Sequence, residues 1–483
     1  MSLLKNLQSL EKQYAVLEPT QHQRHELNKK IEDFSDVFLD DIDNIAAFNA
    51  DDKVTSLFKL DDQRQNLDEI LSIYRKDVIG KGIVASSPGH LGYIPGGGIY
   101  ASSLADYMAA VSNEYAGIYY ASPGAVHIEN ETIEWLKKLI SFPQSAVGNL
   151  TSGGSIANLI ALTAARDKFK IKNEVIRKSV IYLSPQVHHC LHKAVRIIGL
   201  EDIQYRIIDL DENSRMLVSD LEQKIQHDKD QGLKPFLVVA SAGTTDTGAI
   251  DPLEQMADVS EKHGLWFHID AAYGGFFIMV NSKKEAFKGI ERADSLVIDP
   301  HKGLFLPYGL GAVLVKDREA VLHSHHYLAN YMQDAHQDHV TDSPADLSPE
   351  LTRHFRGLRL WLPLKLYGSE PFKICLQHKL LLTQYFRNSL KNMGFNLGPE
   401  PDLSVSYFWY ACEASIQNQF NRKLLEYIHK DGTVFLSSTL INDQFVIRMA
   451  ILAFRTNTNT IDKAVIMIKK ALKLCLKDFK LIA

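Results

Sequence analysis

Short apolar runs alternate with helical stretches between about residues 140 and 320. The runs are rich in β-branched and aromatic residues, and the segments between them repeat apolar positions at helical spacing. We expect strands at Ala146–Leu150, Val180–Leu183, Phe236–Ala240, Leu265–Ile269, Ser295–Ile298 and Gly311–Val315. Helices are expected to begin at Ser155, His188 and Pro252. This order predicts an α/β fold whose mostly parallel central sheet is covered by helices on both faces.

The two ends of the chain have different patterns. Apolar residues fall at helical spacing in Met1–Tyr14, His22–Phe34 and Asp61–Tyr74. These helices have no evident local core, so they either cap the same chain or pack on a second subunit. A smaller α/β segment follows residue 370 and ends in a helix. We therefore predict a helical segment at 1–75, a large domain at 76–370 and a small C-terminal domain at 371–483.

Composition narrows the class of protein without naming an activity. The 483 residues carry a net charge of −5 and are 45% hydrophobic, so no basic surface for nucleic acid is expected. No apolar run approaches the roughly 20 residues that a membrane span needs, and the N-terminus lacks the apolar core of a signal peptide. Four scattered cysteines form no CxxC pair. We expect a cytoplasmic protein with reduced thiols.

One lysine follows directly after a predicted buried strand. The run Leu296–Ile298 leads into Asp299-Pro300-His301-Lys302-Gly303, and an apolar, Gly-containing segment comes next. Residues just past the carboxyl ends of parallel strands lie where open α/β sheets bind ligands. An amine at this place can lose its proton and attack a carbonyl carbon, which is the chemistry of a Schiff-base lysine. The alternative is a solvated loop lysine.

A Gly- and Ser-rich turn follows the first predicted strand of the sheet. Thr151-Ser152-Gly153-Gly154-Ser155 opens a helix, whose backbone N–H groups and dipole favour an anion. The run matches neither GxGxxG nor GxxxxGK[ST], so dinucleotide and ATP sites are disfavoured. We interpret it as a phosphate-binding turn. A Ser N-cap with a tight turn is the plainer alternative.

Two further side chains end predicted strands. His188 can stack on a flat ring, although His188 and His192 are also spaced as zinc ligands on a helix. No third ligand follows at zinc spacing, so no metal is expected. Asp270 ends another strand and needs a cation if it is buried, unless it only caps a helix. The small Ala272 beside it leaves room for a ring.

These four features suit one cofactor. A phosphate, a flat ring, a protonated ring nitrogen and an aldehyde are the groups that the turn, His188, Asp270 and Lys302 would engage. Pyridoxal phosphate carries all of them. The combination is therefore far more specific than any of its parts.

Several runs resemble the group II pyridoxal-phosphate decarboxylases, which include the aromatic-L-amino-acid and glutamate decarboxylases. The runs are Ala121–Pro123, Gln186–His188, Gly243–Thr245, His268–Tyr273, Asp299–Lys302, Phe355–Trp361 and Phe445–Arg448. Ala121-Ser122-Pro123 and the Asp-Pro-His-Lys turn are nearest the aromatic branch. The resemblance implies the fold-type I, aminotransferase-like architecture, an L-amino-acid substrate and a homodimer with sites at the interface.

The resemblance also implies residue roles. It assigns Lys302 the covalent link to the cofactor, Asp270 the pyridine nitrogen and His188 the ring stack. Other implied cofactor contacts are Gly154, Ser155, Thr245, Ala272 and His301. Tyr93, Ile94 and Pro95, in a long Gly- and Pro-rich loop, correspond to a substrate-pocket segment. Arg448 is similar to a structurally important family arginine.

The proton that completes decarboxylation has no clear donor in the sequence. Animal aromatic decarboxylases resemble one another in carrying a loop tyrosine for this step, but residues 334–349 here contain none. His336 and His339 lie in that segment, and His339 is a candidate donor. We expect decarboxylation of an aromatic L-amino acid to its amine. Alternatives are an aldehyde-forming oxidative deaminase, a carbon–carbon lyase and a non-catalytic binding protein.

Overall fold

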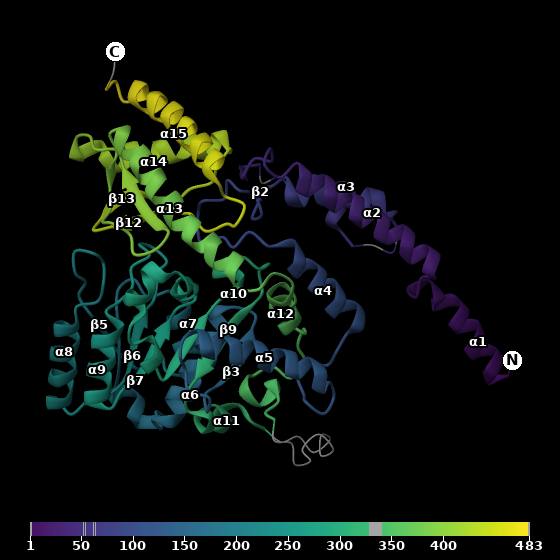
Figure 1. Cartoon of the computed structure of the whole chain (residues 1–483), viewed down its shortest axis with the longest axis horizontal. Coiled ribbons are helices and arrows are strands. Elements are labelled where there is room, and N and C mark those ends of the chain that lie inside the picture. The colour runs from purple at the N-terminus through teal and green to yellow at the C-terminus, as the bar shows by residue number, and fades with distance from the viewer. Residues whose placement is uncertain are drawn as a thin grey trace.

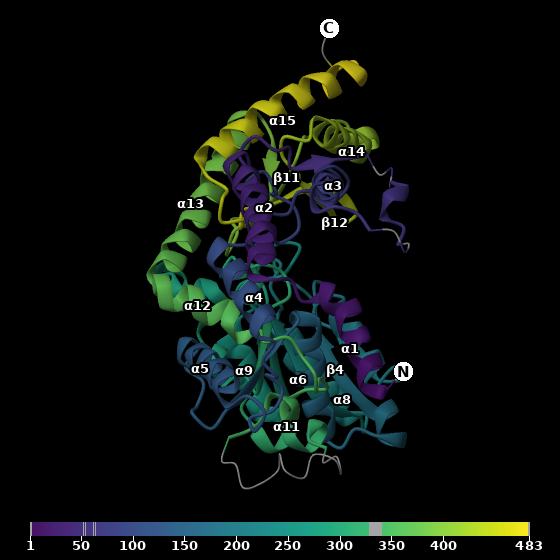
Figure 2. The same cartoon turned by 90° about the vertical axis from the view of Figure 1, so that its right-hand side faces the viewer.

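The computed structural model describes residues 2–51, 53, 55–60, 62, 64–327 and 341–481. A central sheet with its helices forms the larger body, and a smaller sheet with its own helices lies beside it (Figure 1). The N-terminal helices extend away from both bodies (Figure 1), and they project over them when that side faces the viewer (Figure 2). Among the described residues, no helix combines the length and apolarity that crossing a membrane requires.

The central sheet has seven strands in the order β3-β9-β8-β7-β6-β4-β5. Their bounds are β3 Val147–Thr151, β4 Ser179–Leu183, β5 Gln204–Ile207, β6 Lys234–Ser241, β7 Trp266–Asp270, β8 Ser295–Ile298 and β9 Gly311–Val315. Strands β8, β7, β6, β4 and β5 pair in parallel, whereas β9 is antiparallel to both β3 and β8. All strands except β9 therefore direct their carboxyl ends to one edge of the sheet.

Alternate residues along the strands enter two separate cores. In β8, Leu296 and Ile298 join one cluster and Val297 joins the other, as the two-residue period of a strand requires. Helices cover both faces, and their bounds are α5 Pro123–Leu139, α6 Gly154–Lys168, α7 Cys190–Ile197, α8 Val218–Asp230, α9 Leu253–His263 and α11 Arg318–His325. The predicted α/β sheet with helices on both faces is confirmed. Strand β5 escaped prediction because it is a short edge strand with two polar residues.

The smaller body is built on an antiparallel sheet in the order β10-β11-β13-β12. Its elements are β10 Asn396–Leu397, β11 Val405–Trp409, β12 Ser437–Ile441, β13 Gln444–Ala450, α13 Glu370–Asn392, α14 Ala414–Asp431 and α15 Thr458–Asp478. A third apolar cluster joins this sheet to the helices. Helix α12, Gly357–Tyr367, precedes α13, near the predicted domain change.

The N-terminal segment is helical, as predicted, with shifted bounds. Helix α1 covers Leu3–Tyr14, α2 covers Gln21–Asp40 and α3 covers Leu67–Ile73. Helix α3 begins late because Asn66 caps it by accepting a hydrogen bond from Glu69 N. A short pair, β1 Phe48–Asn49 and β2 Gly82–Ile83, precedes α4 Tyr100–Ser112. The three domain ranges given above remain predictions.

Candidate active site

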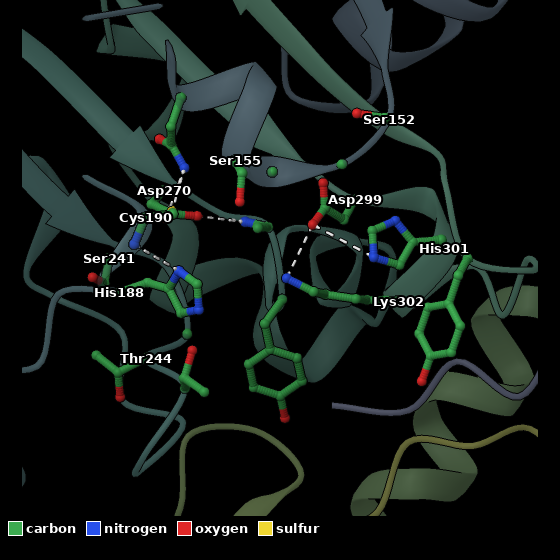
Figure 3. A pocket seen from close by; sticks show the side chains of 18 of the residues that line it. Ser152, Ser155, His188, Cys190, Ser241, Thr244, Asp270, Asp299, His301 and Lys302 are labelled. Carbon is green, nitrogen blue, oxygen red and sulfur yellow. Dashed lines mark hydrogen bonds and ion pairs between the residues drawn. The ribbon is translucent and has the colours of Figure 1, made fainter. Parts of the chain in front are cut away.

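A cavity of about 410 Å³ opens at the carboxyl edge of the central sheet. Side chains from the ends of several strands point into it (Figure 3). Its wall includes Ser152, Gly153, Gly154, Ser155, Asn158, Gln186, His188, Cys190, Ser241, Thr244, Thr245, Asp270, Ala272, Asp299, His301, Lys302 and Tyr308. The turn after β3, His188, Asp270 and Lys302, which were predicted to act together, thus surround a single cavity.

The Gly- and Ser-rich turn lies between β3 and the N-terminus of α6. Gly153 has a φ of 151°, a backbone conformation that L side chains rarely adopt. Helix α6 begins at Gly154, so its unpaired N–H groups face the cavity. The Ser152 and Ser155 side chains are exposed there. Backbone donors, hydroxyl donors and a helix dipole together suit a phosphate group.

Lys302 lies in a single helical turn, α10 Pro300–Gly303, rather than in an irregular turn. Its Nζ lies 3.0 Å from Oδ2 of Asp299, the residue that ends β8 (Figure 3). Burial lowers the pKa of Lys302, but Asp299 and Asp270 more than offset this, so the pKa is raised. In this state Lys302 is therefore a paired ammonium, which must lose its proton before it can attack a carbonyl carbon.

His301 faces the cavity from the same helical turn. Its Nδ1 lies 2.6 Å from the Leu310 carbonyl oxygen, which only an N–H on Nδ1 can satisfy. The neutral ring therefore carries its proton on Nδ1 and leaves Nε2 as an acceptor. Burial lowers the pKa of His301, which keeps the ring neutral. Its Nε2 lies 3.9 Å from Asp299 Oδ2.

Asp270 ends β7 with a hydrogen bond to each oxygen. The Ala272 backbone N–H donates to Oδ1 at 3.0 Å, and the Asn158 side-chain amide donates to Oδ2 at 3.2 Å. Asp270 is not a helix N-cap, because the next helical turn, Gly275–Met279, begins after Gly274. Each oxygen keeps a lone pair for a cation in the cavity.

A chain of hydrogen-bonded polar side chains leads to Asp270 inside the sheet. Asn158 Oδ1 lies 2.7 Å from His268 Nε2, and His268 Nδ1 lies 2.8 Å from Ser295 Oγ. The Trp266 indole N–H donates to that same Oγ at 2.8 Å. Because the amide nitrogen of Asn158 points at Asp270, its oxygen must accept, so His268 carries its proton on Nε2.

Every donor in this chain therefore points toward Asp270. The order is indole N–H to serine, serine hydroxyl to imidazole, imidazole N–H to amide, and amide N–H to carboxylate. Such a polarised series stabilises a negative charge at its end. Burial lowers the pKa of His268 to about 4, so the ring stays neutral at physiological pH.

His188 and the residues near it form the wall opposite the phosphate turn. The Cys190 backbone N–H donates to His188 Nδ1 at 3.3 Å, which leaves Nε2 for the proton of the neutral ring. Thr244 Oγ1 is 2.8 Å from Thr247 Oγ1, which donates to Gln186 Oε1. Thr245 and Ala272 also line the cavity. Among the described residues, no cluster of three metal-ligating side chains exists.

Three predicted substrate-pocket residues lie outside this wall. Tyr93, with a φ of 51°, is 58% exposed, and Ile94 is buried in the core. Their loop packs against the lysine turn, because a Cβ on Gly96 would lie 2.1 Å from the His301 carbonyl oxygen. Arg448 fixes the loop by donating to the Tyr93 and Thr245 carbonyl oxygens. The pocket role of Tyr93, Ile94 and Pro95 stays a prediction.

The sequence assigned no role to several residues that the structure places in the site. His268 and Asp299 lie inside the quoted motifs without a role of their own, and Asn158 lies three residues after the phosphate turn. A polar residue in or just after a predicted buried strand could have pointed to His268 and Asp299. A polar residue one helical turn after the phosphate turn could have pointed to Asn158. The candidate proton donors His336 and His339 lie outside the described residues.

The cavity fits a phosphorylated pyridine aldehyde. The turn before α6 offers donors to a phosphate, and Asp270 has lone pairs for a protonated ring nitrogen. The small Ala272 and the imidazole of His188 leave room for a flat ring between them. Lys302 is the amine that can bond to the aldehyde carbon.

Comparisons with known proteins agree with this geometry. The pyridoxal-dependent decarboxylase conserved domain matches residues 54–411. The chain is 33% identical to an aromatic-L-amino-acid decarboxylase of Bacillus atrophaeus, over 83% of this chain and 84% of that protein. It is 27% identical to a phenylacetaldehyde synthase of Arabidopsis thaliana, over 83% and 85% of the two chains.

Solved structures share the architecture. The crystal structure of Oryza sativa TDC with PLP and tryptamine superimposes with a TM-score of 0.88 at 22% identity, covering 94% of this chain and 99% of that one. Mouse CSAD gives 0.83 at 26% identity, with 92% and 98% covered. The fold is fold-type I of pyridoxal-phosphate enzymes, as expected. The chain belongs to the pyridoxal-dependent decarboxylase family and is an amino-acid decarboxylase that uses pyridoxal phosphate.

Proposed function

We propose that this enzyme converts an aromatic L-amino acid to its amine and CO₂. The observation that carries the proposal is the convergence of Lys302, Asp270, His188 and the N-terminus of α6 on one cavity. An amine, a fixed carboxylate, a ring-stacking imidazole and an anion site are the groups that pyridoxal-phosphate chemistry uses. Their common origin at the carboxyl edge of the sheet gives each a rigid support.

The side chains have distinct tasks in this proposal. Bound pyridoxal phosphate supplies an aldehyde for covalent attachment and a protonated ring that accepts electrons. Lys302 forms the attachment and later returns as a free amine. Asp270 keeps a proton on the ring nitrogen, and the chain from Trp266 to Asn158 holds its charge in place. His188 covers one ring face, and the turn at Ser152–Ser155 holds the phosphate.

An apolar rather than an acidic substrate is supported by the charges around the cavity. No arginine is among the described residues that form its wall. Three arginines that could have clamped an acid are engaged elsewhere. Arg353 pairs with Glu129, Arg356 with Glu350 and Arg359 with Asp106. The relatives named above as acting on aromatic compounds support the same preference.

An aldehyde-forming reaction is the second candidate. It is supported by the likeness to a phenylacetaldehyde synthase and by the absence of tyrosine from the sequence 334–349. In that reaction the substrate, O₂ and water would give an aldehyde, CO₂, ammonia and hydrogen peroxide. Simple decarboxylation consumes no oxygen, so the two reactions differ in a measurable reactant.

A product assay separates these reactions. The purified full-length enzyme is incubated with pyridoxal phosphate and a mixed panel of L-amino acids, and products are identified by mass spectrometry while oxygen is recorded. Aromatic amines with CO₂ and no oxygen uptake are expected. Aldehyde, ammonia and oxygen uptake would replace the proposal by the second candidate. A protein that binds the cofactor but forms no product would be a binding protein instead.

We also propose that the enzyme works as a homodimer. Helix α1 extends away from the rest of the chain (Figure 1) and contains no buried residue, yet Leu3, Leu7 and Leu10 are exposed on it. Tyr107 and Val111 are exposed on α4 in the same way. Exposed apolar faces of this kind favour a second subunit. Light scattering of the full-length enzyme should give twice the 54.4 kDa mass of one chain.

A further inference from the structure

Asp299 is a buried carboxylate that the proposed chemistry has not used. It ends β8 and is 1% exposed, and its Oδ2 lies 3.0 Å from Lys302 Nζ. Its other oxygen, Oδ1, is buried and has no hydrogen-bond partner among the described residues. A Cβ on Gly311 would lie 2.5 Å from that oxygen, so backbone crowds it on one side. Figure 3 shows the carboxylate between Lys302 and His301.

The charge on Asp299 thus depends on one partner. A buried ionised carboxylate is stable only when it is paired and hydrogen-bonded. The cation that pairs with Asp299 is Lys302, the amine that must bond to the cofactor aldehyde. The neighbouring His301 gives no help, because its neutral ring presents an acceptor nitrogen and is 3.9 Å away.

Lys302 in turn is surrounded by groups that favour its ammonium form. Asp299 and Asp270 raise its pKa, the former through charge and a hydrogen bond and the latter through charge, with a smaller contribution from Cys190. His188, His301 and Tyr308 also lie near it. Burial is the main cause of their pKa shifts, lowering the pKa of the two imidazoles and raising that of Tyr308, and the positive charge of Lys302 acts to lower all three. The free amine needed for attack must therefore be produced by removing a proton inside the site.

We propose that Asp299 is the proton partner of Lys302: it takes the ammonium proton when the lysine bonds to the cofactor and returns it when the lysine is released. The proposal deepens the proposed function and rests on Lys302 being the attached lysine. Asp299 acts through Lys302, so it is a positioning and proton-holding residue.

The step balances without another reactant. The Lys302 ammonium gives one proton to Asp299 Oδ2, which leaves a neutral amine and a carboxylic acid. The amine attacks the aldehyde carbon, a carbon–nitrogen double bond forms, and the aldehyde oxygen leaves as water with the two remaining amine protons. When the amine of a substrate displaces Lys302, the lysine would leave as a neutral amine and take the proton back from Asp299. The ammonium–carboxylate pair would therefore be present while the lysine is free and would be lost again when the lysine is re-attached.

The neutral acid also suits the neighbouring phosphate turn. A Cβ on Gly154, at the N-terminus of α6, would lie 3.0 Å from Asp299 Oδ2. A carboxylate this close to a bound phosphate would repel it once Lys302 no longer supplied a positive charge. Protonation removes that repulsion at the moment when the lysine loses its charge.

The test measures capture of the aldehyde rather than turnover. The full-length enzyme, freed of cofactor, is mixed with pyridoxal phosphate or with pyridoxal, which lacks the phosphate, across a range of pH. Absorbance follows bond formation, and borohydride with mass spectrometry verifies the modified lysine. Wild type, Asp299→Asn and Asp294→Asn are compared. Asp294 precedes β8 at the opposite end of the strand and accepts a hydrogen bond from Phe267 N, so it controls for loss of a strand-end carboxylate.

In wild type, capture should accelerate as pH rises, because the ammonium must lose its proton. Asp299→Asn should move the midpoint of this profile to lower pH by about 1–3 units. Below its midpoint the rate of Asp299→Asn should fall about 10-fold per pH unit, whereas the wild-type rate should level off because Asp299 still takes the ammonium proton. Both effects should occur with both aldehydes, and Asp294→Asn should show neither.

An unchanged midpoint in Asp299→Asn, or a wild-type rate that falls as steeply below its midpoint as that of the variant, would overturn the proposal. Effects seen with pyridoxal phosphate but not with pyridoxal would overturn it as well, because Asp299 would then act on the phosphate. Failure of wild type to form an adduct at Lys302 would instead refute the proposed function. Circular dichroism of each variant verifies that the fold is retained.

Discussion

Asp270 and Asp299 end the neighbouring strands β7 and β8, yet their surroundings differ. Both oxygens of Asp270 accept fixed donors, from the Ala272 backbone and the Asn158 amide. Asp299 has one oxygen paired with a flexible lysine and one without a hydrogen-bond partner in the described part of the chain. Asp270 pairs with Val297, so Asp299 lies two positions further in the direction of the neighbouring strand, just past β8. One carboxylate has fixed donors, and the other has a partner that can change its bonding.

These different hydrogen-bond partners allow one site to hold two carboxylates with different tasks. Rigid donors keep a charge in place whatever is bound, which suits a carboxylate that must face a ring cation throughout a reaction. A carboxylate with a removable partner can change its protonation when that partner changes its bonding. The surroundings rather than the residue type separate the two roles.

Lys302→Ala should have the largest effect. Covalent attachment should be lost and turnover should fall by about 10⁴-fold or more, since the nucleophile is gone. The buried Asp299 would lose its cation, which should lower the free energy of unfolding by about 3 kcal/mol. Borohydride reduction and chemical denaturation check the two effects.

A double variant sharpens this test. Lys302→Ala with Asp299→Asn should regain most of the lost stability, whereas Lys302→Ala with Asp270→Asn should not, because Asp270 keeps its own donors. Equal recovery by both second substitutions would show that the two carboxylates share the lysine equally. The comparison drawn between them would then be wrong.

Asp270→Asn should have the next largest effect on turnover. Loss of the charge facing the ring nitrogen should reduce kcat by about 10³-fold, which corresponds to about 4 kcal/mol in the barrier. The covalent adduct at Lys302 should still form, because Asp299 remains. Steady-state kinetics and borohydride trapping measure the two quantities, and loss of the adduct together with turnover would contradict the prediction.

Substitutions in the hydrogen-bonded chain that leads to Asp270 should have a smaller effect on kcat. His268→Phe removes both hydrogen bonds and should reduce kcat by about 10- to 100-fold, the usual range for residues that orient a functional group. His268→Gln can accept from Ser295 and donate to Asn158, so it is the matched control and should stay near wild type. A similar loss in both variants would mean that the polarised chain is not what matters.

The smallest effect should be a pH dependence of stability. Burial lowers the pKa of His268 to about 4 from its usual 6.5, so the unfolded chain binds more protons between these values. Stability is therefore present above pH 6.5 and is lost as pH falls toward 4, by about 2 kcal/mol between pH 7 and pH 5. Denaturant unfolding at the two pH values should show that this loss is reduced by about the same amount in His268→Gln.

Local sequence was sufficient for much of the fold. Strands β8 and β9 were predicted with the bounds that the structure has, because continuous apolar runs between polar turns suit only buried strands. The cofactor also followed from local motifs, since a phosphate turn, a strand-end aspartate and a strand-end lysine are each readable in a few residues. The likeness to known decarboxylases bears out that cofactor and family.

The tertiary structure determined which residues distant in sequence form hydrogen bonds and ion pairs. The hydrogen bond from Asn158 to Asp270 joins residues 112 positions apart, and no local pattern encodes the direction of the donors between them. The charged state of Lys302 was also set by the tertiary structure, because Asp270 reaches it from another strand and Asp299 through the fold of a short helical turn. The sequence by itself determined which chemical groups the site contains. The packing of separate strands decided which charges face each other, because electrostatic interactions depend on distance and burial, not on position in the chain.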